Sequence, residues 1–229
     1  MSFDINTPEM LNRSKQNNFC FAPIGNCCTI QIFDNLNMNS CAEMIGNIRQ
    51  IINQLPQHKP ITDKTPATIK DPYNTSDDTF VFDVSFDCFG GSYSIYRAIA
   101  SMFALAKSKG AIIRTNNIGV AASAASMLAI QGTPGYRIMS ENAYNMIHYG
   151  QTTVTANREN ELDIDTRNKN KERKKLFSIY EQYTKLTPKE LERYTSVENS
   201  GKLYADQCLK KHLCDWILTS NGQLIGRKR

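Results

Sequence analysis

Hydrophobic and polar positions alternate along the chain in two ways, one typical of helices and the other of strands. Apolar residues recur at helical spacing, and short β-branched and aromatic runs between polar flanks separate them. We expect helices over 39–55, 93–110, 119–132 and 157–184, a further helix beginning at Pro188, and one within 201–214. The expected strands are 28–33, 80–86, 111–115, 136–140, 143–149 and 215–219. Strand, helix and strand at this spacing predict right-handed crossovers, so we expect one α/β domain with helices covering a mostly parallel sheet.

Residues typical of helix caps and loops indicate where the expected elements and the folded domain begin and end. Thr187, Pro188 and Glu190 predict a capping box with proline at the first helical position. Ser40 is the expected cap of helix 39–55. Residues 1–27 read as an irregular leader with a short helix at 8–13, and 56–79 as a proline-containing loop insertion. The folded domain is expected over 28–219, followed by a loose tail at 220–229.

Composition and charge narrow the class of protein. The chain has 229 residues, a hydrophobic fraction of 41% and a charged fraction of 21%, which is typical of a globular domain. The net charge of +5 is too small to indicate nucleic-acid binding, and the basic run at 169–175 alternates with acids as on a solvated helix face. We also expect no membrane span and no secretory signal, because apolar runs stay well short of about 18 residues.

The seven cysteines bear on the cellular compartment of the protein and on metal binding. An odd number of cysteines without a signal peptide favours reduced thiols and therefore a cytoplasmic location. Cys208, His212 and Cys214 lie close in sequence, but a zinc site needs more convergent ligands. We therefore interpret them as buried thiols and a surface histidine, with no bound metal.

Candidate chemistry comes from one serine, one histidine and a glycine pair. His148 ends an apolar strand, which can hold its ring rigidly against a cleft. Gly90 and Gly91 follow another strand, where backbone N–H groups can approach a ligand closely. Ser123 stands near the start of the small-residue helix 119–132. A hydroxyl, an imidazole and paired N–H donors are what acyl transfer needs, although a lone histidine or serine in such a position more often has a structural role.

Three segments resemble the proteolytic subunit of Clp protease. CFGGS (88–92) resembles the family's SPGGS, GVAASAAS (119–126) its GQAASMG, and GYRIMSENAYNMIHYG (135–150) its GKRFCLPNSRVMIHQP. The alignment is ungapped from 119 to 150 and keeps Ser123 and His148 25 residues apart, as the family pattern requires. LERYT (191–195) and CDWILT (214–219) resemble IERDT and VDSILT, so the resemblance extends over 28–219.

The resemblance implies a role for each matched position. Ser123 matches the nucleophile, His148 the general base, and Gly91 the first N–H donor of the oxyanion hole. Ala124, where the family usually has methionine, matches the second donor, and a backbone donor tolerates this change. Glu198 matches the third residue, which is an aspartate in the family.

Two positions of this assignment stay open. A small gap in the alignment leaves Asn199 and Ser200 as alternatives to Glu198. Ser126, in the same small-residue run, is a weaker alternative to Ser123 as the nucleophile.

The resemblance also implies a fold, an assembly and a partner. The fold is the ClpP/crotonase-like α/β fold, with repeated β-β-α units and a protruding handle helix, here 157–184. The implied activity is a serine endopeptidase that cleaves peptides and unfolded proteins inside heptameric rings, stacked in pairs. It needs no cofactor of its own, because ATP is used only by an AAA+ unfoldase partner, and neither nucleic acid nor membrane is involved.

Three alternative functions remain open. One is a catalytically inactive structural subunit of the same family. Another is a crotonase-type acyl-CoA enzyme, in which the histidine of MIH would have no role. The third is a dedicated processing protease.

Overall fold

The computed structural model describes residues 18–21, 23–62, 71–148, 159–196 and 201–227, with the side chains of 159–169 left aside. A nine-stranded mixed sheet forms its centre, in the order β1-β2-β3-β4-β5-β8-β9, with β6 paired to β4 and β7 to β6. The strands are β1 Asn18–Cys20, β2 Cys27–Ile32, β3 Val81–Cys88, β4 Ile112–Ala122, β5 Arg137–Ser140, β6 Tyr144–Met146, β7 Lys202–Tyr204, β8 Trp216–Leu218 and β9 Leu224–Gly226. The helices are α2 Met38–Gln54, α3 Tyr93–Ser108, α4 Ala124–Ile130, α5 Glu159–Tyr183, α6 Pro188–Thr195 and α7 Ala205–Lys210.

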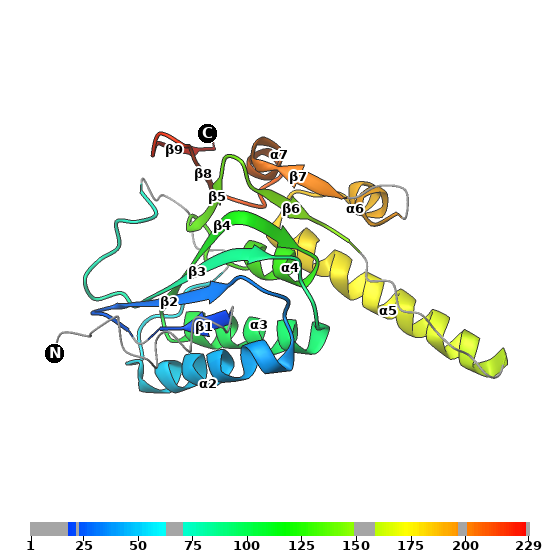
Figure 1. The fold of residues 1–229 in the computed structure, drawn as a ribbon, viewed down its shortest axis with the longest axis horizontal. Helices are drawn as coiled ribbons and strands as arrows, with labels where there is room; N and C mark the ends of the chain where they lie inside the picture. Colours follow the sequence, from blue (N-terminus) through cyan, green and yellow to red (C-terminus); the bar gives the residue numbers. More distant parts are fainter. Residues whose placement is uncertain (1–17, 22, 63–70, 149–158, 197–200, 228–229) are drawn as a thin grey trace.

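The sheet is parallel through its middle and antiparallel at its margins. β2, β3, β4, β5 and β8 run parallel, and β6 is parallel to β4. The pairs β1–β2, β6–β7 and β8–β9 are antiparallel. Figure 1 shows α2 and α3 side by side against one face of the sheet. The expected α/β class with a mostly parallel sheet is therefore confirmed, whereas its division into repeated β-β-α units stays a prediction.

The two helices α2 and α3 bury the apolar stripes that their sequence periodicity predicts. The stripes pack onto the sheet, where β2 and β3 alternate between buried apolar residues and less buried, mostly polar ones. Burial of these side chains, at about 1.5–3 kcal/mol each, supplies the main driving force for this half of the fold. The buried stripe residues are Cys41, Met44, Ile48 and Ile52 of α2, and Ile95, Tyr96, Ile99 and Phe103 of α3.

Helix caps follow the sequence signals in one case and not in the other. The capping box is confirmed: the Glu190 N–H donates to Thr187 Oγ1 at 3.3 Å, and the Thr187 N–H donates to Glu190 Oε2 at 3.0 Å. The cap of α2 is Asn37 rather than Ser40, because Asn37 Oδ1 accepts the Ser40 N–H at 3.0 Å. The Ser40 hydroxyl donates instead to the carbonyl of Asn35.

Both ends of the chain contain strands that sequence periodicity did not reveal. The expected leader holds β1, which pairs with β2, and the expected loose tail holds β9, which pairs with β8. A third missed strand, β7, pairs with β6. Each has only three residues, too few to show an alternating pattern, so their strand structure depends on a neighbour in the sheet. The helix expected at 8–13 lies outside the described residues.

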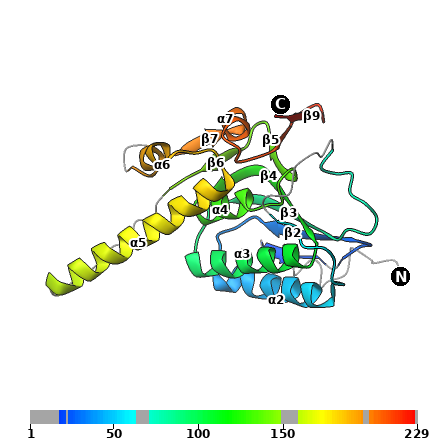
Figure 2. The same ribbon diagram turned by 180° about the vertical axis from the view of Figure 1, so that it is seen from behind.

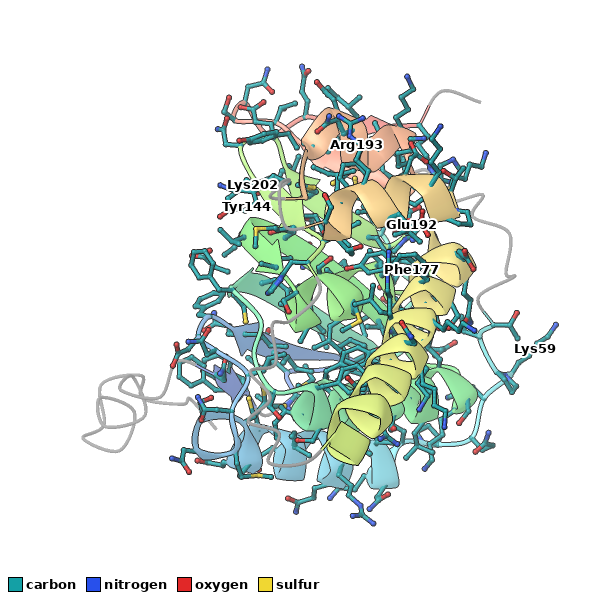
Figure 3. All side chains as sticks on the ribbon, turned by 90° about the vertical axis from the view of Figure 1, so that its right-hand side faces the viewer. Lys59, Tyr144, Phe177, Glu192, Arg193 and Lys202 are labelled. Carbon is teal, nitrogen blue, oxygen red and sulfur yellow. The ribbon has the colours of Figure 1, made fainter. Side chains whose placement is uncertain are left out.

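Helix α5 extends away from the sheet, and only its C-terminal part lies against the rest of the protein (Figures 1 and 2). Near α6, Arg173 lies 5.2 Å from the ring centroid of Phe177 and 4.0 Å from Glu192. Figure 3 shows Phe177 and Glu192 on these neighbouring helices. The helix matches the expected range 157–184, but its role as a handle stays a prediction. No helix in the described ranges is both long and apolar enough to cross a membrane.

A buried carboxylate joins β5, β8 and the C-terminal strand. Asp215 is 4% exposed and accepts hydrogen bonds from Arg137 Nη2 at 2.7 Å and from Arg227 Nη2 at 2.5 Å. It also accepts the Gly135 N–H at 2.7 Å. Burial by itself would raise the pKa of Asp215, but Arg137 and Arg227 outweigh it and hold the pKa below its ordinary value.

Removing this carboxylate is expected to destabilise the fold. Asp215→Ala removes a buried carboxylate that accepts from two guanidinium groups and from the Gly135 N–H, so we expect the free energy of unfolding to fall by about 3–5 kcal/mol in urea titrations. The stabilisation is complete above the unfolded-state pKa of about 4 and disappears as the pH falls through the lower folded-state value. Glu192→Ala, at an exposed pair, is the control and should cost less than about 1 kcal/mol. Equal losses in the two variants would contradict the assigned role.

Candidate active site

Ser123 occupies a sharp turn between β4 and α4. Its backbone has φ 53° and ψ −121°, a left-handed conformation that costs a non-glycine residue about 1–3 kcal/mol. The Ser123 N–H donates to the carbonyl of Met146 at 2.9 Å, and the Ser123 carbonyl accepts the Met127 N–H at 3.2 Å. These bonds hold the turn in place, and a strained serine between a strand and a helix is the arrangement that exposes a nucleophile.

An irregularity in β4 sets up this turn. Between the pairs Phe86–Asn117 and Cys88–Ala121, β4 advances four residues while β3 advances two. The carboxylate of Asp87 fills the gap, because its Oδ1 accepts the Val120 N–H at 3.0 Å. A bulge of this kind redirects the strand that follows it. The expected helix 119–132 is therefore wrong at its start: residues up to Ala122 are strand, and the helix begins at Ala124.

The glycine pair fits against this turn because neither residue has a side chain. A Cβ on Gly90, which has φ +102°, would lie 2.7 Å from Ser123 Cβ and 3.1 Å from the Ala124 nitrogen. A Cβ on Gly91, at φ +137°, would lie 2.5 Å from the carbonyl oxygen of Leu36. Leu36 also bonds to both sides of Gly91: its N–H donates to Gly90, and its carbonyl accepts from Ser92. The glycine turn is thus fixed beside Ser123.

Two amides near Ser123 have no acceptor among the described residues. They are the N–H groups of Gly91, which is exposed, and of Ala124, at the first position of α4. The first N–H groups of any helix lack intrahelical partners, so the second case follows from helix geometry. Unpaired amides beside a strained serine can stabilise a developing oxyanion. Gly90, the neighbour of Gly91, lies against Ser123 and Ala124. The role of the Gly91 and Ala124 amides as oxyanion donors stays a prediction.

His148 follows β6 and is half-buried. Its chain is fixed two residues earlier, where Met146 accepts the Ser123 N–H, and again where the Ile147 N–H donates to Gly201 at 3.0 Å. The segment that carries His148 therefore runs beside the Ser123 turn. Over the described part of the chain, no hydrogen bond joins the Ser123 hydroxyl to the imidazole, so their catalytic pairing stays a proposal.

The candidates for the third residue, Glu198, Asn199 and Ser200, lie outside the described residues. Gly201, the first described residue after them, contacts the segment that leads to His148. A Cβ on Gly201 would lie 2.0 Å from the carbonyl oxygen of Ile147, so only glycine fits at this position. Beyond it, β7 pairs with β6, and Lys202 Nζ lies 4.9 Å from the Tyr144 ring centroid (Figure 3).

Two other nucleophiles near the turn are held in structural roles. Burial raises the pKa of Cys88 to about 11, and its thiol donates to Asp34 while accepting the Gly90 N–H. Ser126 is fully buried, and its hydroxyl contacts Asn145 and Tyr180. The sequence did not reveal these contacts, because Asn145 and Tyr180 are distant from Ser126 along the chain.

Burial shifts the pKa values of Cys208, Cys214 and His212, the residues considered above as metal ligands. All seven cysteines are free thiols, and burial raises the pKa of Cys208 and of Cys214. Burial, followed by the charge of Arg227, lowers the pKa of His212 to about 4. Within the described ranges, no three His, Cys, Asp or Glu side chains are placed to hold a metal ion.

A strand-turn-helix serine beside a glycine turn, on a mostly parallel sheet, defines an α/β protein with the elements of an acyl-transfer site. The family model described as Clp protease matches residues 73–221, and the chain belongs to this family. Two similar proteins are "ATP-dependent Clp protease proteolytic subunit 1" of Tropheryma whipplei strain Twist and "subunit 2" of strain TW08/27. Each is 28% identical over 147 residues, which is 61% of this chain and 65% of the relative. The match thus spans just under two thirds of those relatives, and the chain is a divergent member.

The strained conformation of Ser123 has a measurable consequence. Ser123→Gly and Ser123→Ala both remove the hydroxyl, but only glycine adopts a left-handed backbone without strain. We expect the glycine variant to be more stable than the alanine variant by about 1 kcal/mol in urea unfolding. The matched pair at Ser126, inside α4, should show the opposite sign, with glycine less stable than alanine by about 1 kcal/mol. The same sign at both positions would contradict the left-handed turn.

Proposed function

We propose that this protein is a serine peptidase that hydrolyses peptide bonds through an acyl-enzyme. The observation that carries the proposal is the strained turn at Ser123, whose amide is bonded to the segment leading to His148. The nearby amides of Gly91 and Ala124, which have no acceptor among the described residues, support it. Membership of the Clp protease family supports the same reaction class. The proposed substrate is a peptide or an unfolded protein.

In the proposed reaction, His148 acts in turn as a base and as an acid. His148 takes the proton of the Ser123 hydroxyl as its oxygen attacks the carbonyl carbon of the substrate. The N–H groups of Gly91 and Ala124 donate to the oxyanion of the tetrahedral intermediate. The imidazolium returns its proton to the leaving amine, and a water molecule, activated by His148, then releases the acyl group.

Glu198 is our choice for the residue that orients His148. A carboxylate next to the imidazole holds its tautomer and stabilises the charged form that appears during the reaction. Asn199 or Ser200 would orient the ring without supplying charge. The contact of Gly201 with Ile147 supports a contribution from this segment of the chain.

Covalent labelling tests the nucleophile directly. A fluorophosphonate should label the wild-type protein and not Ser123→Ala, and hydrolysis of fluorescein-labelled casein should fall to background in that variant. Ser101→Ala is the control, because it removes an exposed hydroxyl on α3 that donates to the Arg97 carbonyl within the same helix, and this variant should remain labelled. Labelling of Ser123→Ala at the wild-type rate would refute the assignment, and an unlabelled wild type would favour the inactive structural subunit.

The three candidates for the third residue are separable by the same assay. Glu198→Gln should lower the labelling rate by about 10- to 1,000-fold if its charge stabilises the imidazolium. Asn199→Ala and Ser200→Ala should then stay within about twofold of wild type. A loss confined to either of these two variants would move the role to that residue.

We further propose that the chain assembles into rings through α5. The extension of α5 away from the sheet leaves most of its length available to other subunits (Figure 2). Light scattering on the full chain should show a mass of seven or fourteen subunits, the assembly expected for stacked heptameric rings. An AAA+ unfoldase would be the partner of such an assembly in the cytoplasm. A monomer at all protein concentrations would contradict the assembly.

A further inference from the structure

A buried chain of hydrogen bonds connects α5 to both segments of the candidate active site. It consists of Tyr180 on α5, Ser126 on α4 and Asn145 on β6, which are 1%, 0% and 3% exposed. Tyr180 Oη lies 2.5 Å from Ser126 Oγ, and Ser126 Oγ in turn contacts Asn145 Oδ1. Three helix and strand elements that are distant in sequence therefore meet at one polar contact inside an otherwise apolar region.

The donors in this chain can be assigned from chemistry. Asn145 Oδ1 can only accept, so the single proton of the Ser126 hydroxyl points to it. Tyr180 must then donate its own proton to Ser126 Oγ. Burial raises the pKa of Tyr180, which keeps its hydroxyl protonated and able to donate. The chain runs in one direction, from α5 through α4 to β6.

This chain of hydrogen bonds lies next to the two segments that carry Ser123 and His148. Ser126 is the third residue of α4, the short helix that begins directly after Ser123. Asn145 immediately precedes Met146, the residue whose carbonyl accepts the Ser123 N–H, and is three residues before His148. The two ends of the Ser126–Asn145 contact are thus the segments that must be aligned for the hydroxyl and the imidazole to meet.

A directional polar contact controls geometry in a way that apolar packing does not. An apolar contact between α5 and α4 would tolerate small rotations and shifts, whereas hydrogen bonds weaken steeply as distance and angle change. Unsatisfied partners in a buried site add a further penalty. The chain therefore specifies one relative position of α4, α5 and β6.

We propose that Tyr180 is a positioning residue that aligns Ser123 with His148 through Ser126 and Asn145. This inference rests on the proposed peptidase function and adds that the seating of α5 controls catalysis. The C-terminal end of α5 is anchored in a second way, because Arg137 Nη1 donates to the carbonyl of Tyr183 at 2.9 Å. Tyr180 therefore lies in the part of α5 that is held against the rest of the domain.

The test compares two buried tyrosine hydroxyls. Tyr180→Phe breaks the chain, while the control Tyr96→Phe removes an equally buried hydroxyl on α3 that accepts from Gln131 Nε2 at 2.7 Å. Each loses one hydrogen bond, so we expect both to lower the melting temperature by about 2–4 °C. Only Tyr180→Phe should lower kcat for casein hydrolysis, by about 10- to 100-fold. Its KM should change by less than about twofold.

Ser126→Ala serves as a second variant, because it breaks both contacts without altering α5. It should reproduce the fall in kcat, and the double variant with Tyr180→Phe should be no worse than either single one, as expected for members of one chain. This variant also keeps the proposal testable if Tyr180→Phe does not fold.

An activity-independent measurement separates this inference from the proposed function. The protein has three histidines, and the ring carbon signal of His148 can be assigned by NMR from the spectrum of His148→Gln. Tyr180→Phe and Ser126→Ala should shift that signal, and Tyr96→Phe should not. If the wild type neither hydrolyses casein nor reacts with a fluorophosphonate while the shift occurs, the peptidase proposal fails and the positioning role stands. Unchanged kcat and signal, or equal changes in the Tyr96 control, would overturn the positioning role.

Discussion

The hydrogen bond from the Ser123 amide to the Met146 carbonyl is the contact on which the candidate site depends. It holds a serine in a left-handed conformation that the isolated chain would avoid, and it does so with the segment that continues to His148. This one hydrogen bond thus holds the Ser123 turn in place and keeps the segment that leads to His148 beside it. The strain at this residue is balanced by the sheet, since β4 is paired on both sides where it approaches the turn.

The surroundings of this bond explain why so many small residues gather there. Gly90 lies against Ser123, Gly91 against Leu36, and Gly201 against Ile147, each at a distance that no Cβ could occupy. Backbone segments from five parts of the chain thus approach one another closely, which is possible because these glycines have no side chains. Because these segments are so close, the site is sensitive to small displacements of α4 or β6. The proposed role of the hydrogen-bonded chain through Ser126 is to fix the positions of these two elements.

The sequence predicted the helices and central strands well because their periodicity reflects burial on one or two faces. The stripes of α2 and α3 and the capping box of α6 are local patterns, and each was found where expected. The start of α4 was placed wrongly, because Gly119–Ala122 has the small apolar composition of a helix. Its strand conformation depends on Asp87 and on pairing with β3 and β6, partners that are remote in sequence. The missed strands β1, β7 and β9 have the same origin.

By itself the sequence determined the α/β class, the family and the residue types from which a hydrolytic site could be built, because periodicity and motif spacing are properties of neighbouring residues. Only the tertiary structure decided that Ser123 is strained, that Gly90 lies against Ser123, and that Ser126 is buried in contact with Tyr180 and Asn145. These features arise from contacts between segments far apart in the chain. Hydrogen-bond geometry and steric exclusion act between such segments only after the sheet has brought them together.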